Sequence, residues 1–213
     1  MIELFTHGTA NGHKIAIALE ELKLPYEVKA VNVFAGEGQQ PWFLQISPAG
    51  KIPAIRDTDN GKSVFESNAI LLYLAEKTGK LFPTDAVERS RAFQLLFLQA
   101  SLVGPMFGQR AHFNYFAPET VPYGIRRYDE QGETIHALLD RLLHDRAYFL
   151  DSGFSMVDIS FFPWMSAMIK LGFPFEKHAA LNSWFQRVAA RPAAIKGLGI
   201  PTGIQNLPPR KQL

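Results

Sequence analysis

The sequence predicts an α/β N-terminal domain followed by an all-α helical-bundle domain. Before residue 80, short apolar runs alternate with helical patterns, whereas beyond it the apolar residues recur at helical spacing throughout. A segment with glycine and proline, at 79–84, separates the two patterns. We therefore expect domains at residues 1–80 and 87–213, joined by a linker at 81–86.

The N-terminal domain is predicted to begin with a β-α-β unit. An apolar run at 2–5 is followed by a helical pattern over 11–22, in which Ile15 and Leu19 share one face. Alternation of apolar and polar residues then indicates a second strand over 26–33.

Two further strands and a helix complete this domain. Short runs at 53–56 and 63–65 flank Asn60-Gly61, a strong hairpin signal, so these strands are expected to be antiparallel. A helix with an apolar stripe starts at Ser67 and ends near Gly79. A β-α-β unit followed by a β-β-α unit is the thioredoxin-like order.

The rest of the chain is expected to be helical. Apolar side chains recur at helical spacing over 93–104 and again over 135–142. The sequence at 155–158 is typical of a capping box, which we interpret as the structural start of a helix over 159–169. The tail at 207–211 is expected to be frayed or loosely docked.

Composition limits the classes of function. With 213 residues, 47% of them hydrophobic and 20% charged, the chain is typical of an ordinary globular protein. The net charge is only +2 and no block of like charges occurs, so the sequence does not indicate the basic surface that nucleic-acid binding requires. No apolar run approaches the roughly 20 residues of a membrane-spanning helix, and no signal-peptide pattern opens the chain, so we expect a cytoplasmic protein. The absence of cysteine excludes disulfides, thiolate metal sites and redox chemistry by a protein thiol.

Two short motifs together predict a site that grips a peptide by its backbone and its carboxylate. Pro53 suits the opening of an edge-like strand, and a cis Ile52-Pro53 bond would let the N–H and C=O of Ile52 pair with an extended peptide. Ser67 stands at a helix start, where unpaired N–H groups and the helix dipole favour an anion. This combination suits glutathione. Taken singly, the motifs would be an ordinary Ile-Pro turn and an ordinary Glu66-Ser67 helix cap.

The pairing of this proline with Glu66-Ser67 resembles the glutathione transferase superfamily, whose N-terminal thioredoxin-like domain carries a cis-proline and a Glu/Gln-Ser signature. Further segments resemble its bacterial nu class, which is related to a fungal prion-like nitrogen regulator and includes glutathione-dependent disulfide-bond reductases. The resemblance runs from Ile2 to about Pro192 and implies the glutathione transferase fold. These further segments are Thr9–Lys14, Gly104–Gln109, His112–Asn114 and Pro122-Tyr123.

The chemistry is expected at the N-terminus of the first helix. The resemblance implies that bound glutathione extends its thiol toward residues 6–11, where Thr9 and Asn11 are credited with contacting the sulfur. A helix N-terminus favours the thiolate, and both side chains carry hydrogen-bond donors. Alternatively, Asn11 is merely a helix N-cap and Thr9 a turn residue. His7 and His13 have no nearby cysteine or carboxylate pair and make a poor metal site, so no metal is expected.

The resemblance also implies how glutathione is held in this domain. Glu66 would take the glutamyl ammonium and Ser67 the glutamyl carboxylate, while the backbone of Ile52, before Pro53, would pair with the cysteinyl residue. The glycyl carboxylate needs a cation or an amide, although lysines are more often solvated than ligand-bound. The candidates for that contact are Lys51, Gln39 and Lys14.

The second domain is expected to supply the other wall of the site. Gln109, Asn114 and Arg127 lie on segments that resemble ligand-lining segments of the nu class. Arg127 could bind a carboxylate bidentately, including one in the partner subunit's site, or it could be an ordinary surface arginine. Gly104 and Gly108 would let another backbone or a ligand come close.

These residues favour a glutathione-dependent thiol–disulfide oxidoreductase, in which the ligands bring both sulfurs. Such an enzyme could also have weak transferase or peroxidase activity. The alternatives are a conjugating transferase for small electrophiles and a noncatalytic glutathione-binding regulatory protein on the same fold. Glutathione is the expected co-substrate, and the expected partners are small thiols, disulfides or electrophiles. The resemblance further implies a homodimer.

Overall fold

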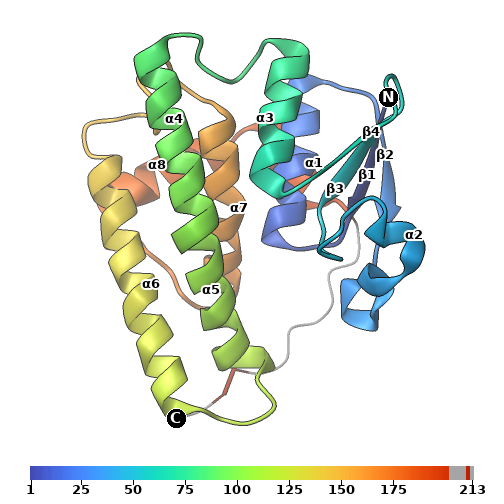
Figure 1. Ribbon diagram of the computed structural model, residues 1–213. Helices are drawn as coiled ribbons and strands as arrows, with labels where there is room; N and C mark the ends of the chain where they lie inside the picture. The colour runs from blue at the N-terminus through green and yellow to red at the C-terminus, as the bar shows by residue number, and fades with distance from the viewer. Residues whose placement is uncertain (202–209, 212–213) are drawn as a thin grey trace.

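The N-terminal part of the chain folds around a four-stranded mixed sheet (Figure 1). The computed structural model describes residues 1–201 and 210–211. The elements of this part are β1 (Ile2–Thr6), α1 (Ala10–Leu22), β2 (Tyr26–Ala30), two 3-10 turns (Val33–Ala35 and Glu37–Gln39), α2 (Pro41–Leu44), β3 (Ala54–Asp57), β4 (Lys62–Phe65) and α3 (Ser67–Thr78). In the order β2-β1-β3-β4, β1 is parallel to β2, and the other neighbours are antiparallel. This confirms the predicted thioredoxin-like order and the antiparallel hairpin.

Helices cover both faces of this sheet. On one face α1 and α3 bury their apolar stripes, and on the other α2 packs Phe43 against Phe5, with 6.2 Å between the ring centroids (Figure 1). The strand predicted at 26–33 ends earlier, because the side chain of Asn32 caps the 3-10 turn that begins at Val33.

The second part of the chain is helical, as its apolar period predicted. Its elements are α4 (Ala86–Leu98), a π-helical turn (Gln99–Val103), α5 (Gly104–Ala111), a second π-helical turn (His112–Phe116), α6 (Pro122–Leu142), α7 (Met156–Lys170), α8 (Ala179–Ala189) and α9 (Pro192–Leu198). The apolar helix α7 packs against α1, α3, α4, α5 and α8, and so lies between the two parts of the molecule (Figure 1). None of the described helices is both long enough and apolar enough to cross a bilayer.

The start of α7 is the predicted capping box. The hydroxyl of Ser155 accepts the backbone N–H of Val157, and the carboxylate of Asp158 accepts the backbone N–H of Ser155. Asp158 is fully buried and also accepts the indole N–H of Trp184 over 2.8 Å. This one carboxylate therefore joins α7 to α8.

The chain returns to its first helix near its end. Helix α9 packs on α1, where a Cβ on Gly197 would lie 2.7 Å from the backbone nitrogen of Ile17, so glycine is needed there. Arg191 binds the carboxylate of Glu21 through two nitrogens, at 2.6 and 2.9 Å. The first helix is thus enclosed by residues from both parts of the chain.

Candidate functional site

Two adjoining cavities lie where the sheet and α1 face the helical part. One, of about 570 Å³, is lined by Phe34 and Met168, and we call it the apolar cavity. The other, of about 390 Å³, is lined by Glu66 and Ser67, and we call it the polar cavity. The residues that line both are Asn11, Lys51, Ile52, Gly108 and Trp164.

The polar cavity gathers the residues of the predicted peptide clamp. The Ile52-Pro53 bond is cis, and within residues 1–201 and 210–211 neither the N–H nor the C=O of Ile52 has a backbone hydrogen-bond partner. The exposed side chains of Lys51 and Gln109 line the same cavity. Its wall therefore offers backbone groups, a cation and an amide to a ligand.

Glu66 and Ser67 add polar groups at the start of α3. Ser67 is the first residue of this helix, where backbone N–H groups lack partners within the helix. Glu66 precedes it with φ 71° and ψ 113°, a backbone conformation that residues other than glycine rarely adopt and that is enriched at binding sites. The wall of the cavity thus combines an exposed carboxylate with a hydroxyl at the positive end of a helix dipole.

Lys14 lies behind Ser67 and is 1% exposed. Its Nζ donates to Oγ of Ser67 over 3.1 Å, to Oδ1 of Asn68 over 3.3 Å and to Oε1 of Gln99 over 2.6 Å. Burial holds the pKa of the Lys14 ammonium well below its ordinary value, and the charge of Glu66 partly opposes this shift. Lys14 was a predicted candidate for a direct contact with the glycyl carboxylate. Lys14 lines the polar cavity, and its bonds anchor the start of α3 to the helical part.

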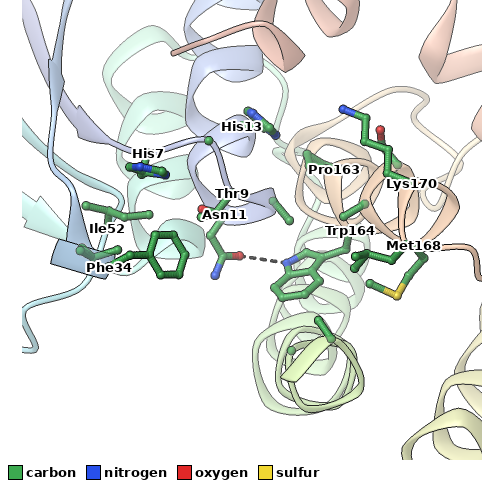
Figure 2. A pocket seen from close by; sticks show the side chains of 18 of the residues that line it. His7, Thr9, Asn11, His13, Phe34, Ile52, Pro163, Trp164, Met168 and Lys170 are labelled. Atoms are coloured by element: carbon green, nitrogen blue, oxygen red, sulfur yellow. Dashed lines mark hydrogen bonds between the residues drawn. The ribbon is translucent and has the colours of Figure 1, made fainter. Parts of the chain in front are cut away.

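Thr9 and Asn11 stand at the start of α1. Thr9 is the N-cap, because its Oγ1 accepts the N–H of Gly12 over 3.3 Å. The alternative that makes Asn11 the cap is therefore wrong, and Asn11 lies in the first helical turn. Oδ1 of Asn11 accepts the indole N–H of Trp164 over 2.9 Å (Figure 2). Both predicted catalytic residues line the apolar cavity, and Asn11 lines the polar cavity as well.

The apolar cavity contains residues that the sequence did not single out. Figure 2 shows Phe34 on one side and Trp164 and Met168 on the other. Lys170 and His13 add polarity, and the pKa of His13 falls to about 4 because it is buried and because Lys170 is near, so His13 is neutral at pH 7. In the sequence Met168 belongs to an apolar helical pattern that indicates core. The sequence signal that could have indicated this cavity was the tryptophan beside a proline in this helix, because a buried indole N–H needs a hydrogen-bond acceptor.

Three of the predicted ligand residues line neither cavity: Gln39, Asn114 and Arg127. Gln39 packs beside Gly50, and Arg127 is exposed on α6. Asn114 is fully buried and donates from Nδ2 to the carbonyl of Arg110 over 3.0 Å.

Asn114 also holds the end of the chain. Its Oδ1 accepts from Nε of Arg210 over 2.9 Å, and its backbone carbonyl accepts the N–H of Lys211 over 2.8 Å. These two residues of the predicted tail are therefore docked, and its residues 207–209 lie outside the described ranges.

One group of possible metal ligands occurs among the described residues, away from both cavities: Glu133, His136 and His178. Their ligand atoms lie within 4.8 Å of one another. The carboxylate of Glu133 is already bound by Nζ of Lys177 at 2.8 Å and by Nε2 of His178 at 2.9 Å. These contacts satisfy the carboxylate without a metal.

Two protein-family models match the chain, one in each of its two parts. The model of the glutathione S-transferase N-terminal domain matches residues 1–76, and the model of the C-terminal domain matches residues 105–192. The chain belongs to the glutathione S-transferase family. The predicted resemblance to the glutathione transferase superfamily and the predicted fold, a thioredoxin-like domain followed by a helical domain, are thereby confirmed.

Relatives of this glutathione S-transferase cover almost its whole length. Disulfide-bond oxidoreductase YfcG from Escherichia coli is 40% identical over an alignment of 203 residues that covers 93% of this chain and 94% of the relative. A glutathione transferase from Pseudomonas putida, solved with one glutathione disulfide per subunit, has a TM-score of 0.86 and 34% identity, covering 94% of this chain and 91% of its own. One from Burkholderia graminis, with two glutathione molecules per subunit, has a TM-score of 0.89 and 35% identity, covering 94% and 88%.

Proposed function

We propose that this glutathione S-transferase is a glutathione-dependent disulfide-bond oxidoreductase. The observation that carries the proposal is the placement of Thr9 and Asn11, two side chains with hydrogen-bond donors, at the start of α1 beside the meeting of the two cavities. The positive end of a helix and such donors stabilise a thiolate. Because the chain contains no cysteine, the reacting sulfurs must come from bound molecules.

Glutathione fits the polar cavity in the orientation that the sequence motifs indicated. Its glutamyl ammonium pairs with Glu66, and its glutamyl carboxylate binds the hydroxyl of Ser67 at the helix start. Its cysteinyl backbone pairs with the N–H and C=O of Ile52. Its glycyl carboxylate lies toward Lys51, and Gln109 closes the opposite wall. This placement directs the thiol toward Asn11.

The reaction is two successive thiol–disulfide exchanges. The thiolate of bound glutathione attacks one sulfur of a substrate disulfide, which breaks the sulfur–sulfur bond and releases one thiolate, protonated by solvent, while a mixed disulfide forms. A second glutathione thiolate attacks the glutathione sulfur of this mixed disulfide and releases the second substrate thiol. Two glutathione molecules are thus oxidised to glutathione disulfide, and one substrate disulfide is reduced to two thiols. Thr9 and Asn11 stabilise the glutathione thiolate as it forms, before it attacks the substrate disulfide.

The names of the relatives support this reaction. YfcG is named a disulfide-bond oxidoreductase. Each subunit of the Pseudomonas putida structure holds one glutathione disulfide, and each subunit of the Burkholderia graminis structure holds two glutathione molecules. The apolar cavity, with Phe34, Trp164 and Met168, favours a second candidate, conjugation of glutathione to an apolar electrophile. An amide and a hydroxyl activate a thiol less than a dedicated base, which favours exchange over conjugation.

Reduction of hydroxyethyl disulfide with glutathione as electron donor tests the proposal. The pure protein should catalyse this reaction. Protein treated beforehand with iodoacetamide, and then freed of the reagent, should keep its full activity, because it has no thiol to alkylate. Asn11→Ala should lower turnover about tenfold while sparing glutathione affinity, since its contact strengthens with thiolate character. Asn182→Ala, on α8, is the matched control.

Two outcomes would contradict the proposal. Rapid conjugation of chlorodinitrobenzene without disulfide reduction would identify a conjugating transferase. Tight binding of glutathione without either activity would identify a noncatalytic binding protein.

We also propose that the chain forms a homodimer and works in the cytoplasm. Phe65 and Phe97 are exposed at 41% and 71%, on β4 and α4, and a partner subunit would bury them. Arg127 would face the partner rather than its own cavities. A reductase that consumes glutathione needs a reduced glutathione pool, which the cytoplasm maintains.

A further inference from the structure

Trp164 determines which way the amide of Asn11 points. The indole Nε1–H donates to Oδ1 of Asn11 over 2.9 Å. An indole has a donor and no acceptor, so the oxygen of the amide must face Trp164 and the nitrogen must face away from it. Figure 2 shows the Asn11 nitrogen turned away from the indole, and no hydrogen bond from the described residues engages it.

The indole itself is held by packing. Trp164 projects from α7 over the face of α5, where a Cβ on Gly104 would lie 3.6 Å from Cζ2 of the indole and one on Gly108 3.8 Å from its Cη2. Both are ordinary van der Waals distances, so the ring lies in contact with this face of the helix. Gly104 and Gly108 were expected to let another backbone or a ligand come close, and here the neighbour is a side chain of the same chain. Packing thus sets the direction of the indole N–H.

We infer that Trp164 is a positioning residue, which holds Asn11 with its amide nitrogen toward the glutathione sulfur. The inference rests on the proposed function, because it needs a thiolate beside Asn11. Without the indole N–H, the amide would no longer be held in this orientation and would turn between its two orientations, so its nitrogen would face the thiolate only part of the time. An oxygen would repel the negative sulfur, whereas the nitrogen donates to it. Trp164 acts on the sulfur through Asn11.

The variant Trp164→Phe tests this inference, since it keeps an aromatic ring and removes the N–H. Turnover with hydroxyethyl disulfide should fall about threefold to tenfold, because the loss cannot exceed that of the Asn11 donor itself. The pKa of the bound glutathione thiol, measured from thiolate ultraviolet absorbance, should rise. The binding constant for glutathione should change little, as the contacts of Ser67 and Ile52 are untouched.

A double-mutant cycle separates positioning from a general structural role. In the Asn11→Ala background, Trp164→Phe should cause no further loss, because the group through which Trp164 acts is gone. Equal losses in both backgrounds would overturn the inference, and so would wild-type turnover and wild-type thiol pKa in Trp164→Phe. If Trp164→Phe does not fold, biosynthetic replacement of Trp164 by its benzothiophene analogue, which keeps the ring shape without the N–H, takes its place.

Failure of the inference can be told apart from failure of the proposed function. If the wild-type protein does not reduce the disulfide, the proposed function is wrong. The thiol pKa of glutathione bound to the wild type and to Trp164→Phe would then still show whether Trp164 acts through Asn11. If the wild type is active and Asn11→Ala is slow, an unaffected Trp164→Phe refutes the positioning role alone.

Discussion

Replacing Ser67 with alanine removes one oxygen that serves two neighbours. On the ligand side, its hydroxyl is the proposed donor to the glutamyl carboxylate of glutathione. On the protein side, its Oγ accepts from Nζ of Lys14 over 3.1 Å. We expect Ser67→Ala to weaken glutathione binding strongly and folding slightly.

The two effects have different sizes. A hydrogen bond to a charged group contributes about 1.5–3 kcal/mol, so its loss should raise the Kd for glutathione about tenfold to a hundredfold. Lys14 retains Oε1 of Gln99 at 2.6 Å and Oδ1 of Asn68 at 3.3 Å as acceptors. The free energy of unfolding should therefore fall by only about 1 kcal/mol.

Calorimetric titration with reduced glutathione measures the first effect, and urea unfolding measures the second. Ser63→Ala, on the exposed strand β4, removes the same chemical group and should change neither quantity. Affinity equal to that of the wild type in Ser67→Ala would show that the carboxylate pocket is misplaced. A loss of several kcal/mol in unfolding free energy would show instead that the main role of Ser67 is to hold Lys14.

Two further predictions concern folding and assembly. Asp158→Ala should lower the free energy of unfolding by about 2–4 kcal/mol, because the N–H groups of Ser155 and Trp184 lose their acceptor in a buried place; an unchanged urea midpoint would contradict this. Light scattering at micromolar concentration should give twice the mass of one chain, and Phe97→Glu should lower that mass toward a monomer. A monomeric wild type would remove any role for Arg127 in a partner's site.

The features that could be read from the sequence are those that depend on neighbours in the chain. Pro53, the Asn60-Gly61 turn and the 155–158 capping box each constrain the backbone within a few residues, and the structure confirms the elements that they predict. Asn114 was assigned to the ligand by resemblance, but it is buried, lines neither cavity and accepts from Arg210, contacts that only packing reveals.

The contacts that could not be predicted from the sequence join residues that are far apart in the chain. Lys14 donates a hydrogen bond to Gln99, which is 85 residues away in the sequence, and Trp164 donates one to Asn11, which is 153 residues away. In the sequence Lys14 was a lysine with no visible partner, and lysines are almost never fully buried unless they are paired. Helical spacing indicates which residues are buried, but it does not show which polar group each one meets. The walls of the site that come from α7 therefore required the structure.

The use of Thr9 and Asn11 in place of a thiol has a consequence for oxidative damage. A cysteine that reacts with oxidants can pass through sulfenic acid to sulfinic and sulfonic acids, which permanently inactivate an enzyme that depends on it. In the proposed mechanism the vulnerable sulfur belongs to glutathione, which leaves after each turnover. An overoxidised sulfur would be discarded with its carrier and replaced from the cellular pool. The polypeptide, with a hydroxyl and an amide at this position, would keep working under conditions that would progressively inactivate a cysteine-dependent reductase.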